Sequence, residues 1–577
     1  MWEESNRQQT TTEMKKTVAA VVAICVATGI SAQTRDEQYA VPLKCAYRIS
    51  GTYGELRGGH YHAGLDMSTF GEENVEVHAA EDGWVSRVKV GAYGYGRALY
   101  IDHADGHTTV YGHLNGFAAK IDSVIRREQY EKESFEAQIF LERGRIKVNR
   151  DEVVAYSGNT GGSGGPHLHF EVRDTGTEEP LNPMRFIATQ KDDVPPTVYG
   201  VKIYALGDDA QVAGGQKDKY MKLAQISGKT VDVYGKIGVG VHCTDYVEKG
   251  GRPCGIVEMR LYDGERLVYR SRVDHFPFDL NKHVNSHIDY GESVVNKRYV
   301  QKAWVEPGNK LPIYVTQETP TVVEEGETHK MRYEVVDFAG NKSTVAFTLR
   351  GRRNAALGKK SDGKGDLVRW ERTWAKDTLG VDVVIPHHSL YRDAWVSVEK
   401  VDRGVSLPAG YSIGDVREPM EKKMVVTMSV PEKWKALGKK VFVGRVVGKG
   451  VVYAGGEMRE DVGMGNVALI CARVGQFGTY TVDVDTVAPS VGVRNKGTVV
   501  GREGWIYIGV GDDKSGVARY EVRIDGRWEV FEYDYKKTRL KAQMSYLGIG
   551  KGSHTLEAVV EDGCGNRREI SWKFRVE

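Results

Sequence analysis

The sequence predicts a mostly β protein that is divided into several domains. With 577 residues, the chain is several times longer than a usual domain of roughly 100 to 200 residues, so we expect roughly three to five domains. Its 68 glycines and 30 tyrosines accompany many short Val, Ile and Tyr runs that are broken by Asp-Gly and Gly-Asn pairs. Such runs are typical of strands joined by turns. The alternation in Lys440–Gly444 follows the same pattern.

The charge balance excludes one large class of partners. The 80 basic and 78 acidic residues nearly cancel. A protein that holds nucleic acid or an anionic membrane through bulk charge carries a clear excess of one sign. We therefore expect no nucleic-acid partner, and we expect the true partner to be recognised at a specific site.

The N-terminus carries the pattern of an export signal. Lys15 and Lys16 precede the apolar run Val18–Val26, and small residues lead to a cleavage position after Ala32. The polar residues before Met14 are either part of this signal or an artefact of an upstream start site. The apolar run is too short to cross a bilayer of about 30 Å, and we expect no transmembrane span in the mature chain. The expected location is the periplasm or envelope, with an extracellular location also open.

The rest of the chain contains an internal repeat. Asp192–Val198 matches Asp485–Val491, and Asp337–Asn341 matches Asp562–Asn566 in the same order. This predicts two copies of one β module, the first with an insertion before Val335. Small sandwiches of immunoglobulin type fit the strand spacing. The expected division is a signal peptide at 1–32, a first domain at 36–190, an immunoglobulin-like module with an insertion at 191–350, a β-rich module at 351–484, and an immunoglobulin-like module at 485–577.

Motifs with chemical meaning all fall in the first domain. They are Gly58–Asp66, Val110–Leu114, Gly158–Gly162 and Gly165–Glu171. In a strand, residues two apart share a face, so His167 and His169 would project together while Leu168 and Phe170 face a core on the other side. Two imidazoles are therefore expected to point at one place.

These residue types suit a hydrolytic zinc site. Such a site needs about three nitrogen and oxygen ligands and one open position, and it lowers the pKa of water to about 7. His62 and Asp66 supply one nitrogen and one carboxylate, and one of the strand histidines completes the set. His113 and the other strand histidine remain for proton transfer and for stabilising an oxyanion.

The ordered motifs resemble the lysostaphin and LytM family of zinc metalloendopeptidases, which hydrolyse peptidoglycan. H-x-x-x-D, a His in a Tyr-x-His-Leu context, and Gly-x-x-Gly-Pro-His-Leu-His-Phe-Glu carry the resemblance, which covers about a quarter of the chain. It implies a LytM-type domain of antiparallel sheet, a duplicated hybrid motif. It also implies His62, Asp66 and His169 as ligands of one Zn²⁺ per chain, with His113 and His167 as the catalytic pair.

The resemblance implies an endopeptidase that cuts peptide cross-links, with peptidoglycan peptide stems as the partner. The bond that is cut stays open, as do three roles for the C-terminal modules: binding glycan, tethering the enzyme to the envelope, and shielding the groove. Envelope or regulatory proteins are possible partners of these modules. One departure is a long connection after Leu114, which we expect to be helical from about Ile121 to Leu141 and to border the groove.

Other hypotheses compete with the predicted zinc peptidase. Two His and one carboxylate also describe a non-haem iron oxygenase, but there the first His and the carboxylate usually stand two apart, not four. A non-catalytic peptidoglycan-binding or activator protein of the same fold is the main alternative, although such proteins are expected to lack ligands. We interpret four further histidines as structural: His60, His78, His103 and His107. Cys243 and Cys254 could form a disulfide, or all cysteines could be free thiols.

Overall fold

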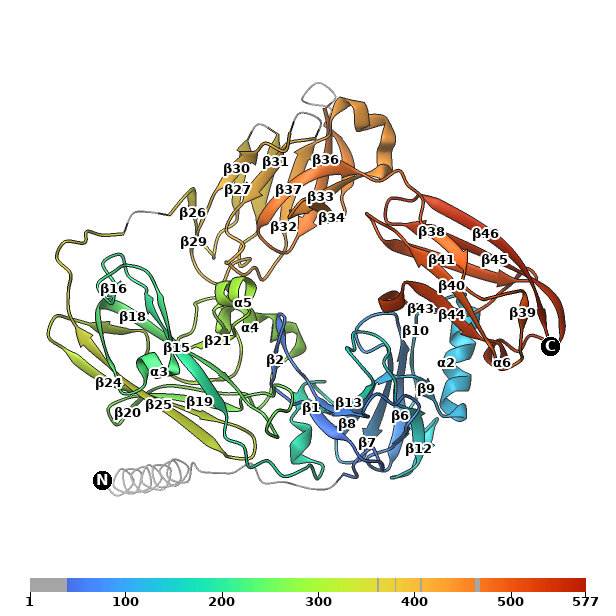
Figure 1. Cartoon of the computed structure of the whole chain (residues 1–577), viewed down its shortest axis with the longest axis horizontal. Coiled ribbons are helices and arrows are strands. Elements are labelled where there is room, and N and C mark those ends of the chain that lie inside the picture. The colour runs from blue at the N-terminus through green and yellow to red at the C-terminus, as the bar shows by residue number, and fades with distance from the viewer. Residues whose placement is uncertain (1–38, 361–362, 379, 405–406, 462–466) are drawn as a thin grey trace, which may run out of the picture.

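The computed structural model describes residues 39–360, 363–378, 380–404, 407–461 and 467–577. The predicted export signal lies outside these residues. Within them the protein is mostly β, which confirms the predicted fold class. Four parts follow one another around a ring, and the C-terminal part returns to the first (Figure 1). No helix in the described ranges is long and apolar enough to cross a membrane.

The N-terminal domain is built on a nine-stranded sheet. Its strands run in the order β1-β4-β13-β8-β7-β6-β10, with β11 on β6 and β14 on β13. Their bounds are β1 Arg48–Gly51, β4 Leu65–Ser68, β6 Gly83–Val90, β7 Arg97–His103, β8 His107–Leu114, β10 Ala137–Phe140, β11 Lys147–Val148, β13 His167–Asp174 and β14 Pro180–Leu181. Smaller sheets contain β2 Leu56–Arg57 with β3 His60–Tyr61, and β5 Glu76–His78, β12 Val153–Tyr156 and β9 Gly116–Phe117.

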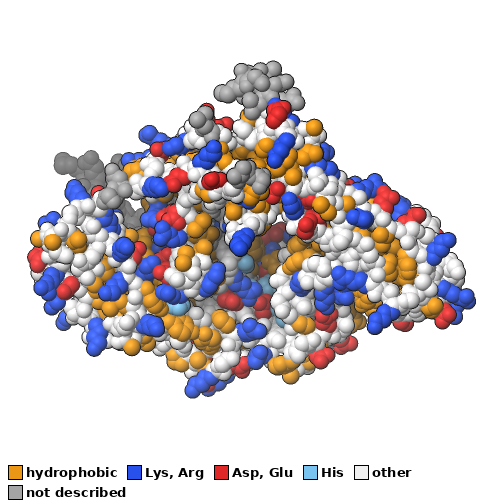
Figure 2. All heavy atoms as spheres, turned by 45° about the horizontal axis from the view of Figure 1, so that its top comes forward, with side chains coloured by type: hydrophobic (Ala, Val, Ile, Leu, Met, Phe, Trp, Pro, Cys, Tyr) orange, Lys and Arg blue, Asp and Glu red, His pale blue; other side chains and the backbone are white. Residues whose placement is uncertain are grey.

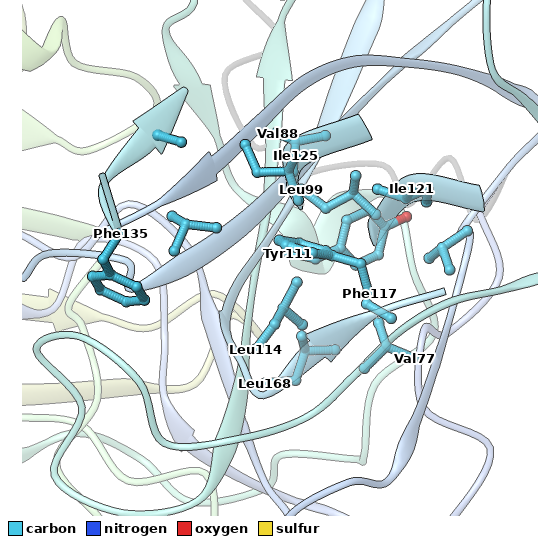
Figure 3. Close-up of a cluster of buried hydrophobic side chains, with 14 of the residues drawn as sticks. Val77, Val88, Leu99, Tyr111, Leu114, Phe117, Ile121, Ile125, Phe135 and Leu168 are labelled. Atoms are coloured by element: carbon cyan, nitrogen blue, oxygen red, sulfur yellow. The ribbon is translucent and has the colours of Figure 1, made fainter. Parts of the chain in front are cut away.

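One face of this sheet covers the hydrophobic core. Leu168 on β13, Tyr111 on β8 and Leu99 on β7 are fully buried, and they meet Ile121 and Ile125 in the close-up of Figure 3. Because side chains alternate along a strand, the even positions of β13 enter this core and the odd ones face the opposite side. The predicted core face of His167–Phe170 agrees with this arrangement.

The helix after Leu114 is shorter than predicted. Helix α2 spans Ala119–Glu131, and its buried residues include Ile121 and Ile125. The chain then turns through Glu133, whose φ is 43°, and continues into the edge strand β10, which pairs with β6. The predicted end at Leu141 was wrong because Phe135 and Ile139, which fit a helical pattern, pack from a turn and an edge strand instead.

The first C-terminal module contains an eleven-stranded sheet with the order β17-β15-β18-β25-β24-β19-β20-β22, and β16, β21 and β23 also pair with β18. The strands are β15 Thr197–Ala205, β16 Gln211–Val212, β17 Lys219–Lys222, β18 Thr230–Thr244, β19 Glu258–Asp263, β20 Arg266–Arg272, β21 Val300–Lys302, β22 Tyr314–Gln317, β23 Thr321–Val323, β24 Thr328–Val336 and β25 Lys342–Gly351. The expected insertion holds α4 Val284–His287 and α5 Tyr290–Asn296, while α3 spans Leu223–Ile226.

The next module places two five-stranded sheets around one core. The first has the order β27-β28-β32-β36-β35, and the second β30-β31-β37-β33-β34. Their bounds are β27 Trp374–Thr378, β28 Val381–Ile385, β30 Val398–Val401, β31 Gly410–Ile413, β32 Met424–Ser429, β33 Val441–Val447, β34 Gly450–Tyr453, β35 Glu457–Asp461, β36 Val467–Val474 and β37 Gly478–Val484, with β26 Asp366–Val368 and β29 Ala394–Val396 paired beside them.

The last module shares a feature of strand pairing with the first C-terminal module. Its sheets are β38-β40-β44-β43 and β39-β46-β45-β41-β42. Their bounds are β38 Ser490–Val493, β39 Val499–Val500, β40 Trp505–Gly511, β41 Val517–Ile524, β42 Arg527–Trp528, β43 Glu532–Asp534, β44 Arg539–Gln543, β45 Gly552–Asp562 and β46 Arg567–Val576, and α6 spans Met544–Leu547. In both modules the last strand pairs in parallel with an early one, β25 with β18 and β46 with β39.

The ring closes where α2 meets the last module, at the lower right of Figure 1. The hydrophobic cores of the N-terminal domain and the last module are continuous. Tyr130 of α2 packs edge-on against Trp528, with 5.4 Å between ring centroids, and its hydroxyl donates to Glu529 at 2.6 Å. Helix α2 therefore packs against the last module. None of its residues lines the large groove described below.

Candidate metal centre

The sheet brings all five predicted site residues together. Asp66 lies on β4, His113 near the end of β8, and His167 and His169 on β13, while His62 follows β3. Strand β13 pairs with both neighbours, so His169 lies opposite Asp66 on one side and Gly112 on the other. Sequence positions more than 100 residues apart thus become adjacent because three strands are in register.

Three donor atoms converge on one point. His62 Nε2 lies 3.0 Å from His169 Nδ1 and 3.1 Å from Asp66 Oδ1, and the last two atoms are 2.8 Å apart. Zinc with bonds of about 2.0 to 2.1 Å separates tetrahedral ligand atoms by about 3.4 Å. A shift of a few tenths of an ångström would therefore suit an ion, so the three residues fit a zinc site.

The hydrogen bonds of the two histidines leave the converging nitrogens available. Nδ1–H of His62 donates to the carbonyl oxygen of Thr52 at 2.9 Å, and Nε2–H of His169 donates to Glu171 at 2.8 Å. When one ring nitrogen donates a proton, the other can offer its lone pair to a metal. Both outer partners thus support the ligand form of the imidazole.

The carboxylate of Asp66 is held in one orientation. Arg57 donates to its Oδ2 at 2.6 Å, which leaves Oδ1 facing the histidines. Burial alone would raise the pKa of Asp66, but the charge of His62 and hydrogen bonds with His167 and His169 hold that pKa well below its ordinary value. The residue is therefore an anion over the whole physiological range.

The two ligand histidines differ in their protonation. Burial lowers the pKa of His62 to about 4. Burial also disfavours the charged form of His169, yet hydrogen bonds to Asp66 and Glu171 raise its pKa to about 9. In the metal-free protein a proton therefore lies between His169 and Asp66, and metal binding would release it.

A glycine allows the two ligand segments to approach. A Cβ atom on Gly64 would lie 2.5 Å from the carbonyl oxygen of Phe170 and 2.9 Å from Cε1 of His169. No side chain fits there, so the small residue between His62 and Asp66 is needed for the close packing of this segment on β13.

His113 and His167 form a second pair beside the triad. Their ring centroids are 4.8 Å apart. Nδ1–H of His113 donates to the carbonyl oxygen of Thr160 at 2.8 Å, and Nδ1–H of His167 donates to that of Gly165 at 2.8 Å. Nε2 of His113 remains available for a substrate, whereas Nε2 of His167 lies 3.4 Å from Oδ1 of Asp66. His113 has a φ of 59°, a left-handed conformation that costs roughly 1 kcal/mol and sets the direction of its side chain.

Burial also fixes the charge of His113. Desolvation and the neighbouring His169 and His167 lower its pKa to about 3. A neutral imidazole with its Nδ1 proton engaged can accept a proton at Nε2. The pair can therefore take part in proton transfer, which is the role that the sequence predicted.

A groove opens from the site toward the first C-terminal module. It has a volume of about 1130 Å³ and is lined by residues of both parts, including Arg57, His167, His242 and Cys254. The insertion of the first module supports this wall. Asn281 accepts from the backbone nitrogen of Tyr61 at 2.6 Å and donates to its carbonyl oxygen at 3.0 Å. Histidine side chains are visible in a hollow near the centre of Figure 2.

The last module touches the other side of the site. Lys536 donates to the carbonyl oxygens of Asn159 and Ser163 at 2.5 and 3.1 Å. Ser163 is itself 3.1 Å from Nδ1 of His167, and Thr160 holds His113. The loop that supports both of these histidines is thus clamped by a residue far along the chain.

Sequence reasoning missed Arg57, Thr52 and Tyr95 as part of the site. Arg57 stands directly before the Gly58–Asp66 cluster, and Tyr95 lies in a Gly-Tyr-Gly segment. The neighbouring sequence could therefore have identified both as candidate site residues. Tyr95 donates to Glu171 at 2.5 Å. Glu171, the last residue of the fourth motif, is fully buried and accepts from His169.

The remaining histidines and cysteines lie apart from the triad. His103 is buried and bonded to Thr109, and His78 bonds to the backbone of Asp151. Their contacts agree with the structural interpretation. The cysteines in the described ranges are free thiols, and Cys243 and Cys254 form no disulfide in the structure.

Comparison with known proteins gives two family matches. Residues 60–130 match the model of peptidase family M23, and residues 365–485 match that of a Zu5-like domain. The DD-carboxypeptidase/endopeptidase Mpg of Neisseria meningitidis serogroup B is 32% identical over 142 residues, which is 24% of this chain and 26% of that protein. An uncharacterized metalloprotease of Haemophilus influenzae is 32% identical over 123 residues, 21% of this chain and 20% of that protein. The chain thus spans only about a quarter of the length of the Neisseria relatives it matches.

Solved structures also align with part of the chain. The catalytic domain of lysostaphin from Staphylococcus simulans is 22% identical with a TM-score of 0.18, and the match covers 24% of this chain and 90% of that one. A zinc containing peptidase from Vibrio cholerae is 27% identical with a TM-score of 0.19, covering 27% of this chain and 39% of that one.

Proposed function

Since the chain contains a LytM-like metallopeptidase domain of family M23, we propose that the protein is a zinc-dependent endopeptidase that hydrolyses peptide cross-links of bacterial peptidoglycan. The observation that carries the proposal is the convergence of His62 Nε2, Asp66 Oδ1 and His169 Nδ1 within 3.1 Å of one another. An ion bound there would act as a Lewis acid that polarises the scissile carbonyl and activates water.

Two residues beside the triad supply the proton transfer. Nε2 of His113, neutral because of burial, accepts the proton of the attacking water, and Thr160 stabilises the resulting imidazolium through Nδ1. His167 also lines the groove, and its imidazole stabilises the oxyanion. The proton then passes to the leaving amine nitrogen, so the peptide and one water yield a carboxylate and an amine.

The groove is consistent with an extended peptide. Its volume of about 1130 Å³ exceeds what a single side chain needs, and its walls come from two parts of the chain. The substrate class is supported by the Neisseria relative, which is named a DD-carboxypeptidase/endopeptidase. Peptidoglycan peptide stems and an extracytoplasmic location, reached through the export signal at residues 1–32, belong to the same proposal.

The proposal is tested by measuring metal content and hydrolysis together. The full chain, loaded with zinc, should contain one equivalent of metal and release amines from purified sacculi while cross-linked muropeptides disappear. His169→Ala should lose both properties. His113→Ala should keep the metal and lose hydrolysis by about 10² to 10⁴-fold.

The controls separate the alternatives. His103→Ala changes a buried histidine outside the triad and should keep the metal. Release of D-alanine without loss of cross-links would replace the endopeptidase by a carboxypeptidase. Zinc binding without any cleavage of sacculi or isolated muropeptides would contradict the enzyme and favour a binding or activator protein.

A further inference from the structure

A cluster of three aspartates lies where the N-terminal domain joins the first C-terminal module. Asp192 belongs to the connecting segment, Asp245 follows β18, and Asp337 follows β24. One carboxylate oxygen from each lies within 4.8 Å of the others. Asp245 and Asp337 are 3% and 2% exposed, so two of the three charges are removed from water.

The protein supplies neutral donors to this cluster, among them the backbone nitrogens of Tyr246 at Asp245 and of Gly340 at Asp337. Asn341 donates to both oxygens of Asp337 at 2.9 Å, and the backbone nitrogen of Val194 donates to Asp192 at 2.9 Å. Oδ1 of Asp245 is buried and has no hydrogen-bond partner. Within the described residues no Lys, Arg or His forms an ion pair with any of the three. A buried carboxylate oxygen without a partner is costly unless a cation meets it.

The electrostatics agree with a missing positive charge. Burial, together with the charges of Asp337 and Asp192, raises the pKa of Asp245 to about 8. Burial likewise raises the pKa of Asp337 to about 6. Carboxylates in such surroundings are poorly ionised unless a cation compensates them.

We propose that Asp192, Asp245 and Asp337 bind one Ca²⁺ ion, which fixes the junction between the N-terminal domain and the first module. All donors are oxygens, which hard cations prefer, whereas the nitrogen-rich triad around His169 suits zinc. Calcium accepts six to eight oxygens in irregular geometry, so backbone carbonyls and water can complete a site at this loop junction.

The last module contains a matching cluster that serves as an internal comparison. Asp485, Asp512 and Asp562 occupy the repeated positions. Oδ2 of Asp512 accepts from three successive backbone nitrogens, at 3.1, 2.8 and 2.8 Å, and Ser515 donates to Asp485 through its hydroxyl at 2.6 Å. These donors stabilise the carboxylate oxygens of the second cluster, as an ion would stabilise those of the first cluster. We therefore assign no ion to the second cluster.

The calcium site is connected to the zinc ligands through the groove wall. The backbone nitrogen of Cys254 donates to the carbonyl oxygen of Asp245 at 2.9 Å, and that of Gly255 donates to the hydroxyl of Thr52 at 2.8 Å. The carbonyl oxygen of Thr52 then orients His62 at 2.9 Å. An ion at Asp245 would hold the loop whose contact positions a ligand of the other metal.

The test uses the zinc-loaded full chain in calcium-free buffer, titrated with CaCl₂ by calorimetry and followed by thermal unfolding. The parent should bind one equivalent, with a Kd of about 10⁻⁴ to 10⁻³ M as in other extracellular modules, and should melt at a higher temperature with calcium. Asp245→Asn should bind at least roughly tenfold more weakly. The matched control Asp512→Asn should behave as the parent.

The unfolding temperature of Asp245→Asn without calcium shows whether the variant folds. Asp245→Asn keeps the shape of the side chain and removes a carboxyl group that is costly to ionise without a cation, so in the absence of calcium it should unfold at the same or a higher temperature than the parent. In millimolar calcium the order should reverse. The proposal is overturned if the parent binds no calcium up to millimolar concentration, or if Asp512→Asn and not Asp245→Asn abolishes binding. None of these measurements depends on peptidase activity.

Discussion

Nε2 of His169 lies 2.8 Å from Oε1 of Glu171, two residues further along the same strand. Both side chains are buried, and Arg173 donates to the other oxygen of Glu171 at 2.6 Å. Burial opposes ionisation, but the charge of Arg173 and the bond to His169 lower the pKa of Glu171 to about 2. An anion behind a ligand histidine increases the basicity of the ring.

Glu171→Gln should therefore weaken zinc binding. The amide can still accept from His169, but it lacks the charge, and loss of such an outer partner costs about 10 to 100-fold in metal affinity. Competition with a chromophoric chelator measures the change. Asp174→Asn is the matched control, because Asp174 ends the same strand and bonds to Thr177 away from the site. An unchanged affinity in Glu171→Gln would show that Glu171 does not support the ligand.

A buried ion pair holds the ring closed. Arg97 of the N-terminal domain donates to Glu532 of the last module at 2.7 Å, and the side chains are 19% and 14% exposed. Arg97→Met leaves Glu532 with Lys541 alone, at 3.2 Å, while Glu532→Gln removes the anion from both cations. Breaking a buried pair costs up to about 3 to 5 kcal/mol. Arg97→Met and Glu532→Gln should each destabilise the docked module, whereas the double variant should lose less than the sum.

Limited proteolysis and denaturant unfolding of the full chain check this prediction. The control is the pair Arg523–Glu133, which crosses the same contact at 2.8 Å but is exposed at 34% and 51%. Water screens an exposed pair, so Arg523→Met should have a much smaller effect than Arg97→Met. Equal effects of both pairs would contradict the role given to burial.

Lys536 should tune the reaction through the loop it clamps. Its ammonium group bonds to the carbonyl oxygens of Asn159 and Ser163, next to the partners of His113 and His167. If the proposed peptidase activity holds, Lys536→Ala should lower kcat about two- to fivefold with little change in KM, since an exposed hydrogen bond is worth about 1 kcal/mol. Lys537→Ala, which changes an exposed neighbour, should leave both constants unchanged, and an increase in kcat for Lys536→Ala would instead mean that the module obstructs the groove.

Strand alternation explains why the site was largely predictable. The period of two placed His167 and His169 on one face and Leu168 and Phe170 on the other, and the sheet agrees with that pattern. The mostly β class followed from turn residues and short apolar runs for the same local reason. The repeated Asp-x-x-Gly-Asn segments also have a local cause, because Asn341 and Asn566 each tie the turn to the start of their module.

Contacts between distant segments could not be read in this way. The approach of Lys536 to Asn159 joins positions 377 residues apart, and nothing in either local pattern encodes it. The length of α2 was misjudged because Phe135 and Ile139 satisfy a helical spacing while packing from a turn and an edge strand. Tertiary packing decided between two structures that the local pattern allowed.

His287 should make the protein less stable in mild acid. It is 1% exposed on α4, its Nε2–H donates to Gln301 at 3.2 Å, and burial lowers its pKa from 6.5 to about 4. As the pH falls from 6.5 to about 4, His287 becomes protonated in the unfolded chain but stays neutral in the folded protein. The free energy of unfolding therefore decreases in this pH window and is retained above it. At 1.36 kcal/mol per pKa unit, the loss between pH 7 and pH 5 is about 2 kcal/mol.

His287→Gln should remove this dependence, because the amide keeps the hydrogen bonds and does not titrate. Urea unfolding of the zinc-loaded full chain at pH 7 and pH 5 measures the effect as a difference between parent and variant. The other histidines titrate equally in both proteins and cancel in the comparison. The exposed His387, changed to Gln, is the control and should follow the parent. If His287→Gln lost as much stability as the parent between the two pH values, the acid sensitivity would have to arise elsewhere.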